Sequence, residues 1–185
     1  AISILSGLAT HKNARPQFIA SLGFAYHEQG KIDLAIAAYQ KAISLEPRLI
    51  DAHYNLHAAL MDAKNLKPSI ASLERVVQLN PQDFDAILTL GVLQDYQGNA
   101  KEAEQYFAKL PNQNALIQSR VDAWQYLKEA NKSKLPPVLG SIHATFELAL
   151  NSAKVEGMVL EFGVRHANST RQLAAIAKQD VHGFD

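Results

Sequence analysis

Residues 16–47 read PQFIASLGFAYHEQGKIDLAIAAYQKAISLEP, and the same arrangement returns twice further along the chain. A shift of 34 residues aligns Leu22-Gly23 with Leu56-His57 and then with Leu90-Gly91. The same shift aligns further columns, which hold Tyr39, Leu73 and Phe107; Ala35, Ser69 and Ala103; Gly30, Lys64 and Gly98; and Pro47 with Pro81. Because the matches recur in one register, the sequence contains an internal repeat of this length.

The repeat resembles the tetratricopeptide repeat, a helix–turn–helix unit of the same period. The first copy, from Pro16 to Pro47, fits the family pattern best. The second, about residues 50–81, carries His57 and Lys64 where the family has glycine or a small residue. The third, about residues 84–110, ends early at Pro111. The resemblance implies a mainly α-helical solenoid of about three repeats.

The physical chemistry of the first copy agrees with this resemblance. Small side chains at Gly23, Ala35 and Ala42 let two helices approach closely, and Tyr39 fills the space beside them. Gly30 favours a sharp turn, because glycine adopts a positive φ at little cost. One helix pair cannot bury its apolar face alone, so the pairs are expected to stack.

The repeat pattern extends to both sides of the three copies. Ala1, Leu5 and Leu8 stand one period before Ala35, Tyr39 and Ala42, which predicts a preceding half repeat and a chain that starts inside a longer array. Residues 115–131 carry apolar side chains at helical spacing and are expected to close the solenoid. We therefore expect a solenoid domain over residues 1–131 and a linker over residues 132–137.

Stacked helix pairs curve, and the first helix of each pair lines the concave face. The repeat positions predict a partner-binding groove formed by Gln17, Phe24, His27, Asp51, Tyr54, Met61, Leu88, Val92 and Asp95. Some family members grip a C-terminal carboxylate there with Lys and Asn, but the corresponding residues here are Ala20, Phe24, Tyr54, Ala58, Leu88 and Val92. The groove is expected to bind a protein or peptide; alternatively, it packs against the next domain or a second copy.

Composition and short motifs exclude several other classes of site. Lys and Arg total 18 and Asp and Glu total 18, so no excess basic charge favours nucleic acid. His53 and His57 have metal-ligand spacing, but both occupy packing positions of the repeat, and no metal site is expected. The chain has no cysteine and no apolar run of about 20 residues, which predicts a cytoplasmic protein without a membrane span.

The pattern changes over residues 138–185, where a helix is followed by a strand, a second helix and a second strand. A short apolar run, Met158 to Gly163, has an acid and a glycine near its end, and a second strand over residues 181–184 is followed by Asp185. We interpret this as one βαβ unit with an acidic residue near the end of each strand. An acid at the end of a second strand can accept both ribose hydroxyls, so the unit suits an adenosine-containing cofactor.

Residues 159–169, VLEFGVRHANS, resemble motif I of class I S-adenosylmethionine-dependent methyltransferases, with the macrocin O-methyltransferase-like subgroup closest by eye. Gly183-Phe184-Asp185 matches the end of that subgroup's second strand. The resemblance implies that Glu161 and Gly163 shape the methionine side of the pocket. It implies that Asn168 and Ser169 bind the cofactor's carboxylate, and that Asp185 binds the ribose. Arg165 and Ala167 depart from the glycines of the wider superfamily.

The two resemblances predict a tetratricopeptide scaffold joined to the opening of a Rossmann-like methyltransferase domain. The parent enzyme would transfer a methyl group from S-adenosylmethionine to a small-molecule or sugar oxygen, or to a nitrogen. We assign no catalytic residue, because the rest of such a domain would lie beyond Asp185. This chain is expected to be an inactive fragment that binds no cofactor alone. The alternative is a non-enzymatic adaptor whose groove binds a peptide or partner protein, with self-association as a further possibility.

Overall fold

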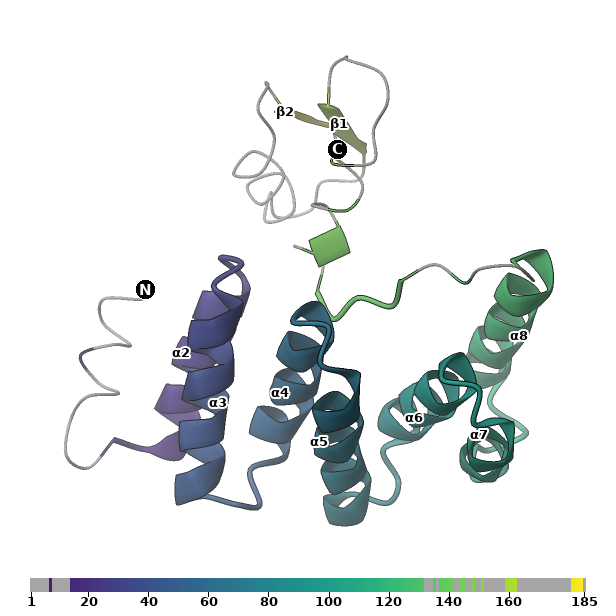
Figure 1. Cartoon of the computed structure of the whole chain (residues 1–185), viewed down its shortest axis with the longest axis horizontal. Helices are drawn as coiled ribbons and strands as arrows, with labels where there is room; N and C mark the ends of the chain where they lie inside the picture. Colours follow the sequence, from purple (N-terminus) through teal and green to yellow (C-terminus); the bar gives the residue numbers. More distant parts are fainter. Residues whose placement is uncertain are drawn as a thin grey trace.

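The computed structural model shows a row of antiparallel helices that stack side by side along the chain (Figure 1). It describes the following residues: 7, 14–131, 135, 137–141, 144, 145, 148, 151, 159–162 and 181–184. The helices of this part are α2 (Pro16–His27), α3 (Ile32–Leu45), α4 (Ile50–Asp62), α5 (Leu66–Leu79), α6 (Phe84–Tyr96), α7 (Ala100–Phe107) and α8 (Ala115–Ala130). Three helix pairs and a closing helix therefore confirm the predicted solenoid over this range.

The turn inside each pair has the same geometry in all three repeats. Gly30, Lys64 and Gly98 adopt positive φ angles of 70°, 60° and 85°. At each turn two backbone N–H groups donate to carbonyl oxygens of the last helical turn, as Asn65 does to Leu60 at 2.8 Å. This is the hydrogen-bond pattern of a helix C-terminus closed by a left-handed residue. The predicted role of Gly30 is confirmed, and Lys64 takes the same conformation without being glycine.

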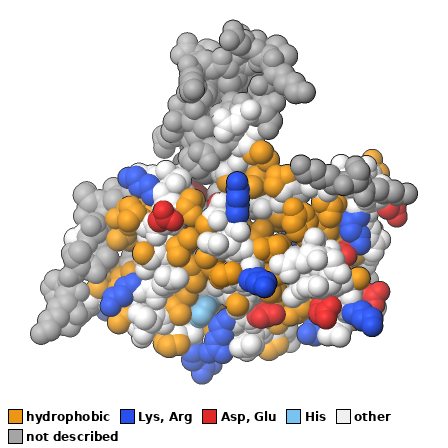
Figure 2. All heavy atoms as spheres, in the orientation of Figure 1, with side chains coloured by type: hydrophobic (Ala, Val, Ile, Leu, Met, Phe, Trp, Pro, Cys, Tyr) orange, Lys and Arg blue, Asp and Glu red, His pale blue; other side chains and the backbone are white. Residues whose placement is uncertain are grey.

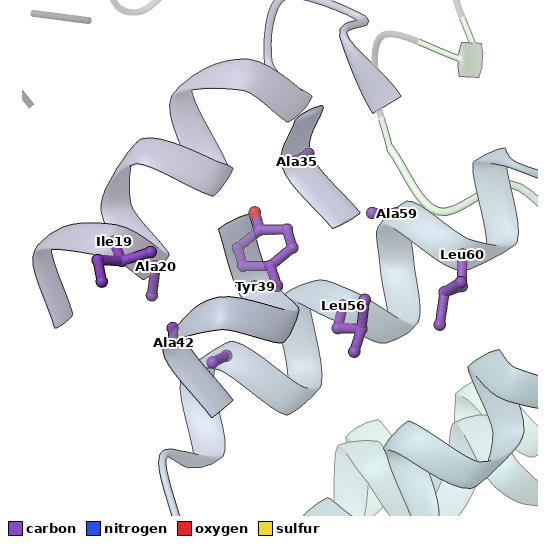
Figure 3. Packing of buried hydrophobic residues seen from close by; sticks show 9 residues of the cluster. Ile19, Ala20, Ala35, Tyr39, Ala42, Leu56, Ala59 and Leu60 are labelled. Atoms are coloured by element: carbon purple, nitrogen blue, oxygen red, sulfur yellow. The ribbon is translucent and has the colours of Figure 1, made fainter. Parts of the chain in front are cut away.

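In the first and third helix pairs, a glycine lets the two helices approach each other closely. A Cβ added to Gly23 would lie 2.8 Å from the Tyr39 ring, and one added to Gly91 would lie 2.5 Å from the Phe107 ring. These two glycines therefore make room for an aromatic side chain. In Figure 3, Tyr39 lies between the helix that carries Ile19 and Ala20 and the helix that carries Leu56, Ala59 and Leu60.

The second repeat places a buried polar contact where its neighbours have glycine. His57 and Ser69 are 7% and 0% exposed. The Ser69 hydroxyl donates to the His57 carbonyl oxygen at 3.1 Å, and the same Oγ lies 2.7 Å from His57 Nδ1. Because that hydroxyl has only one proton, Nδ1–H is the donor in the second bond. Leu73, smaller than an aromatic residue, stands at the position of Tyr39.

The third repeat is shorter, as Pro111 predicts, and α8 follows it. Helix α7 has 8 residues, whereas α3 and α5 have 14 each. Ile117 of α8 is buried in one cluster with Leu88 and Ile87 of α6. The Asn114 side chain accepts the N–H groups of Leu116 and Ile117 and so caps the start of α8. Helix α8 thus closes the solenoid by packing on α6.

Two short strands follow, β1 (Val159–Phe162) and β2 (Val181–Phe184). They pair in parallel, with Val159 opposite Val181 and Phe162 opposite Phe184. The predicted helix between them and the predicted half repeat over Ala1, Leu5 and Leu8 lie outside the described residues. The βαβ unit as a whole therefore stays a prediction.

Candidate functional site

The concave face carries a pocket between α2 and the first half of α4. Its volume is about 350 Å³, within the range of ligand-binding clefts. Of the predicted groove residues, the structure brings together Gln17, Phe24, Asp51 and Tyr54. Ala20, Ser21, Leu49 and Asn55 complete the lining. Phe24 is 52% exposed, although it is a large apolar side chain, so it offers an anchor for a partner.

The polar groups of this pocket are neutral or acidic. Burial raises the pKa of the Tyr54 hydroxyl, and the carboxylates of Asp83 and Asp85 raise it further. This hydroxyl therefore stays protonated and can act as a hydrogen-bond donor. Gln17 donates from Nε2 to the Glu46 carboxylate at 2.8 Å, which leaves its amide oxygen as an acceptor. Asp51 adds a carboxylate, and among the described residues that line the pocket none has a basic side chain.

At the other end of α2 and α4, two predicted groove residues are buried. His27 is 5% exposed, and its Nε2 lies 2.8 Å from the Asp62 carboxylate. Met61 is 7% exposed and belongs to a core cluster with Leu90 and Leu93 of α6. Neither side chain is open to a partner in this structure, because His27 is paired with Asp62 and Met61 packs in the core.

The three predicted groove residues of α6 are covered by α8. Leu88 is 3% exposed, and Val92 packs on the same cluster. Asp95 accepts a hydrogen bond from Trp124 Nε1 at 2.8 Å and also binds the Lys128 ammonium group. Helix α8 therefore occupies the concave face of the third repeat, where repeat positions alone suggest an open groove.

Comparisons with known proteins agree with this architecture. A family described as "TPR repeat" matches residues 23–64, and one described as "Tetratricopeptide repeat" matches residues 60–130. The chain contains tetratricopeptide repeats. Among curated proteins, none matches the chain significantly.

Solved structures of other proteins share the fold of about two thirds of the chain. The crystal structure of MamA is 24% identical over 66% of this chain and 68% of its own, with a TM-score of 0.56. The first TPR of Spaghetti (RPAP3) bound to the HSP90 peptide SRMEEVD is 20% identical, with a TM-score of 0.53. That match covers 64% of this chain and 94% of the other.

The tetratricopeptide packing accounts for both histidines of α4. His53 Nε2 donates to the Pro47 carbonyl oxygen at 3.1 Å, and His57 bonds to Ser69. Burial lowers the pKa of His57 to about 4, against a smaller opposite effect of Ser69. His57 is therefore neutral at physiological pH. In the part of the chain that the structure describes, no group of three acidic, His or Cys side chains could hold a metal.

The surface of the repeats gives further information on partners. On the face drawn in Figure 2, Lys and Arg side chains lie scattered, with Asp and Glu among them and hydrophobic patches between. Among the described residues of this face, no continuous basic stripe of the kind found on nucleic-acid-binding faces is present. Of the helices described, none has the length and apolarity that crossing a membrane requires.

The residues predicted to bind S-adenosylmethionine are not part of this site. Gly163, Asn168, Ser169 and Asp185 lie outside the described residues, and of Glu161 only the backbone within β1 is described. Sequence reasoning missed Ser21, Leu49 and Asn55 as pocket residues. It also missed Asp62, which stands one residue after the groove position of Met61. The 34-residue alignment places Glu28 and Tyr96 at the equivalent positions, so an acidic residue recurs in the first repeat but not in the third.

Proposed function

We propose that the pocket between α2 and α4 binds an internal, extended segment of a partner protein. The observation that carries this proposal is the half-exposed Phe24 ring beside Tyr54 and Leu49, in a cleft of about 350 Å³. Aromatic anchors of this kind dominate the energy of many protein interfaces. The peptide-bound RPAP3 neighbour supports a peptide ligand for the fold.

The chemistry of the pocket favours one class of peptide. An apolar side chain would contact Phe24 and Leu49, and a Lys or Arg beside it would pair with Asp51. The peptide SRMEEVD bound by the neighbour is acidic, whereas the lining residues that the structure describes include no cation to hold it. Charge complementarity therefore selects an apolar and basic segment over an acidic C-terminus.

Selection from a phage-displayed library of random peptides tests this proposal. Enriched sequences should combine an apolar residue with a neighbouring Lys or Arg, and binding should fall at least about tenfold in Phe24→Ala. Leu34→Ala is the matched control, because Leu34 is 51% exposed and does not line the pocket. Equal loss in both variants, or enrichment of acidic C-termini, would refute the proposal. A synthetic SRMEEVD peptide serves as the expected non-binder.

A second candidate function is methyl transfer. The parallel pairing of β1 with β2, joined by residues 163–180, supports it, because parallel strands require a crossover of a dozen or more residues. In this proposal Glu161, Gly163, Asn168, Ser169 and Asp185 hold S-adenosylmethionine. Calorimetric titration of S-adenosylmethionine into the longest form of the protein tests it. Binding should vanish in Asp185→Ala but persist in Asp180→Ala; absence of binding would leave the scaffold as the whole function.

A further inference from the structure

Asp62, the last residue of α4, holds the chain segment that follows α8. Its side chain is only 2% exposed. One carboxylate oxygen accepts the Gly140 backbone N–H at 2.6 Å, and the other lies 2.8 Å from His27 Nε2. The Ser141 hydroxyl donates a third hydrogen bond. Burial alone would raise the pKa of this carboxyl, but the three donors outweigh it and hold the pKa below its ordinary value.

Gly140 lies directly against the concave side of α4. A Cβ added there would stand 1.9 Å from the Ala58 carbonyl oxygen and 2.6 Å from its carbon. No side chain fits at that distance, and backbone cannot move aside as a flexible side chain can. Ala58 is the equivalent of Phe24 in the first repeat, one period earlier. The segment therefore occupies the part of the groove that is open in the first repeat.

Apolar contacts flank these polar ones. Pro137, Val138 and Leu139 line a pocket of about 280 Å³ together with Met61, Leu66 and Tyr96. Val138 also packs against the core cluster between α4, α5 and α6. In Figure 1 the described part of this segment, drawn in green, lies at the end of α4. A short, non-helical segment thus makes the three kinds of contact expected of a peptide ligand: main-chain, side-chain and apolar.

We propose that Asp62, His27 and the Ala58 backbone form a peptide-recognition site that selects two apolar residues followed by Gly-Ser. Residues 137–141 of the same chain occupy this site. A partner segment of the same chemistry then binds only when the chain's own segment leaves. The specificity follows from the contacts: Gly is required by the Ala58 carbonyl, and a hydroxyl is favoured by the buried carboxylate. The site is separate from the pocket at Phe24 and does not require that pocket to bind a peptide.

Fluorescence anisotropy with a labelled peptide of residues 135–143, LPPVLGSIH, tests the proposal on the whole chain. In Gly140→Ala the chain's own segment cannot seat, so the peptide should bind about tenfold more tightly than to the wild type. Gly7→Ala is the matched control, because a Cβ at Gly7 meets nothing within 4 Å. The variant peptide LPPVLASIH should bind neither protein, and adding Asp62→Ala to Gly140→Ala should abolish binding of LPPVLGSIH.

Several results would overturn the proposal. One is equal binding of LPPVLGSIH to the wild type and to Gly140→Ala. Another is no binding of LPPVLGSIH to Gly140→Ala when the circular dichroism of this variant matches the wild type. Equal binding of LPPVLASIH and LPPVLGSIH to Gly140→Ala would contradict the requirement for glycine in the bound peptide. That comparison of two peptides on one folded protein stays decisive even where Asp62→Ala does not fold. The selection of peptides at Phe24 uses other residues and another probe, so either proposal can fail alone.

Discussion

The two halves of the concave face differ although they are built from the same repeat. Phe24, Ala58 and Val92 occupy one repeat position, at successive steps along the row. Phe24 is half exposed beside an open pocket, Ala58 lies under Gly140, and Val92 packs under α8. The repeat thus creates a groove along its whole length, and the chain that follows the repeats covers most of it.

This difference shows that groove positions do not by themselves define a binding site. In the covered half, Asp85 and Asp95 of α6 bind Arg120 and Lys128 of α8, and Asp95 also accepts from Trp124. The same positions in the first repeat hold Gln17 and His27, and Gln17 lines the pocket beside Phe24. What a tetratricopeptide groove can bind therefore depends on which part its own chain leaves open.

Removing Trp124, which anchors α8 in the covered half, should cause the largest change in stability. Trp124 is 7% exposed and donates to Asp95, so Trp124→Ala loses both packing and a hydrogen bond. We expect the free energy of unfolding to fall by about 4 kcal/mol. Urea denaturation followed by far-ultraviolet circular dichroism measures it. Tyr126→Ala, at a position 70% exposed on the same helix, should change it by less than about 0.5 kcal/mol.

Acid should weaken α4, the helix that both halves share. The folded state lowers the pKa of His57 from 6.5 to about 4, so the unfolded chain binds a proton more readily between these values. The free energy of unfolding should therefore fall by up to about 3 kcal/mol as the pH drops from 6.5 to 4. His57→Gln keeps a donor for Ser69 and does not titrate. Its stability should be less pH-dependent by that amount; parallel profiles would contradict the assignment.

Relieving the backbone strain of Lys64, beside the covered half, should raise the free energy of unfolding by a smaller amount. Lys64 lines a pocket together with Pro137–Leu139, and its φ of 60° lies in the left-handed region that favours glycine over lysine. Lys64→Gly should raise the free energy of unfolding by about 1 kcal/mol. Lys41→Gly, in the interior of α3, should lower it by about 1 kcal/mol. A loss of stability in both variants would argue against a strained turn.

Truncation in the open half should barely change stability. Phe24→Ala removes a side chain that is already 52% exposed, so the free energy of unfolding should shift by less than about 0.5 kcal/mol. Differential scanning calorimetry checks this directly. A small shift makes any loss of peptide binding attributable to the pocket; a shift of several kcal/mol would instead place Phe24 in the core.

The sequence could predict the repeats because their signals are local and recurrent. Gly30 and Gly98 mark turns, Pro47 and Pro81 follow helices, and a 34-residue shift superposes the packing positions. The sequence shows that the second repeat has His57 where the first has Gly23, but it does not show why. Its reason is the partner at the facing position, Leu73 in place of Tyr39, together with the hydroxyl of Ser69.

The covered half could not be predicted, because its contacts join positions without a common period. Residues 132–137 have the composition of a linker, and only the structure shows that the chain after them returns to α4. The hydrogen bond from Gly140 to Asp62 spans 78 residues. Helix α8 could be predicted from its apolar spacing, but the choice of α6 as its partner depends on pairs such as Trp124 with Asp95.

Hydrogen exchange at the Gly140 amide tests the division of the concave face most directly. In the structure this N–H donates to a nearly buried carboxylate. Nuclear magnetic resonance of the whole chain at neutral pH should therefore find it exchanging at least about a hundredfold more slowly than in the free peptide LPPVLGSIH. Protection should be lost in Asp62→Ala. Exchange at the rate of the free peptide in the wild type would contradict a groove occupied by its own chain.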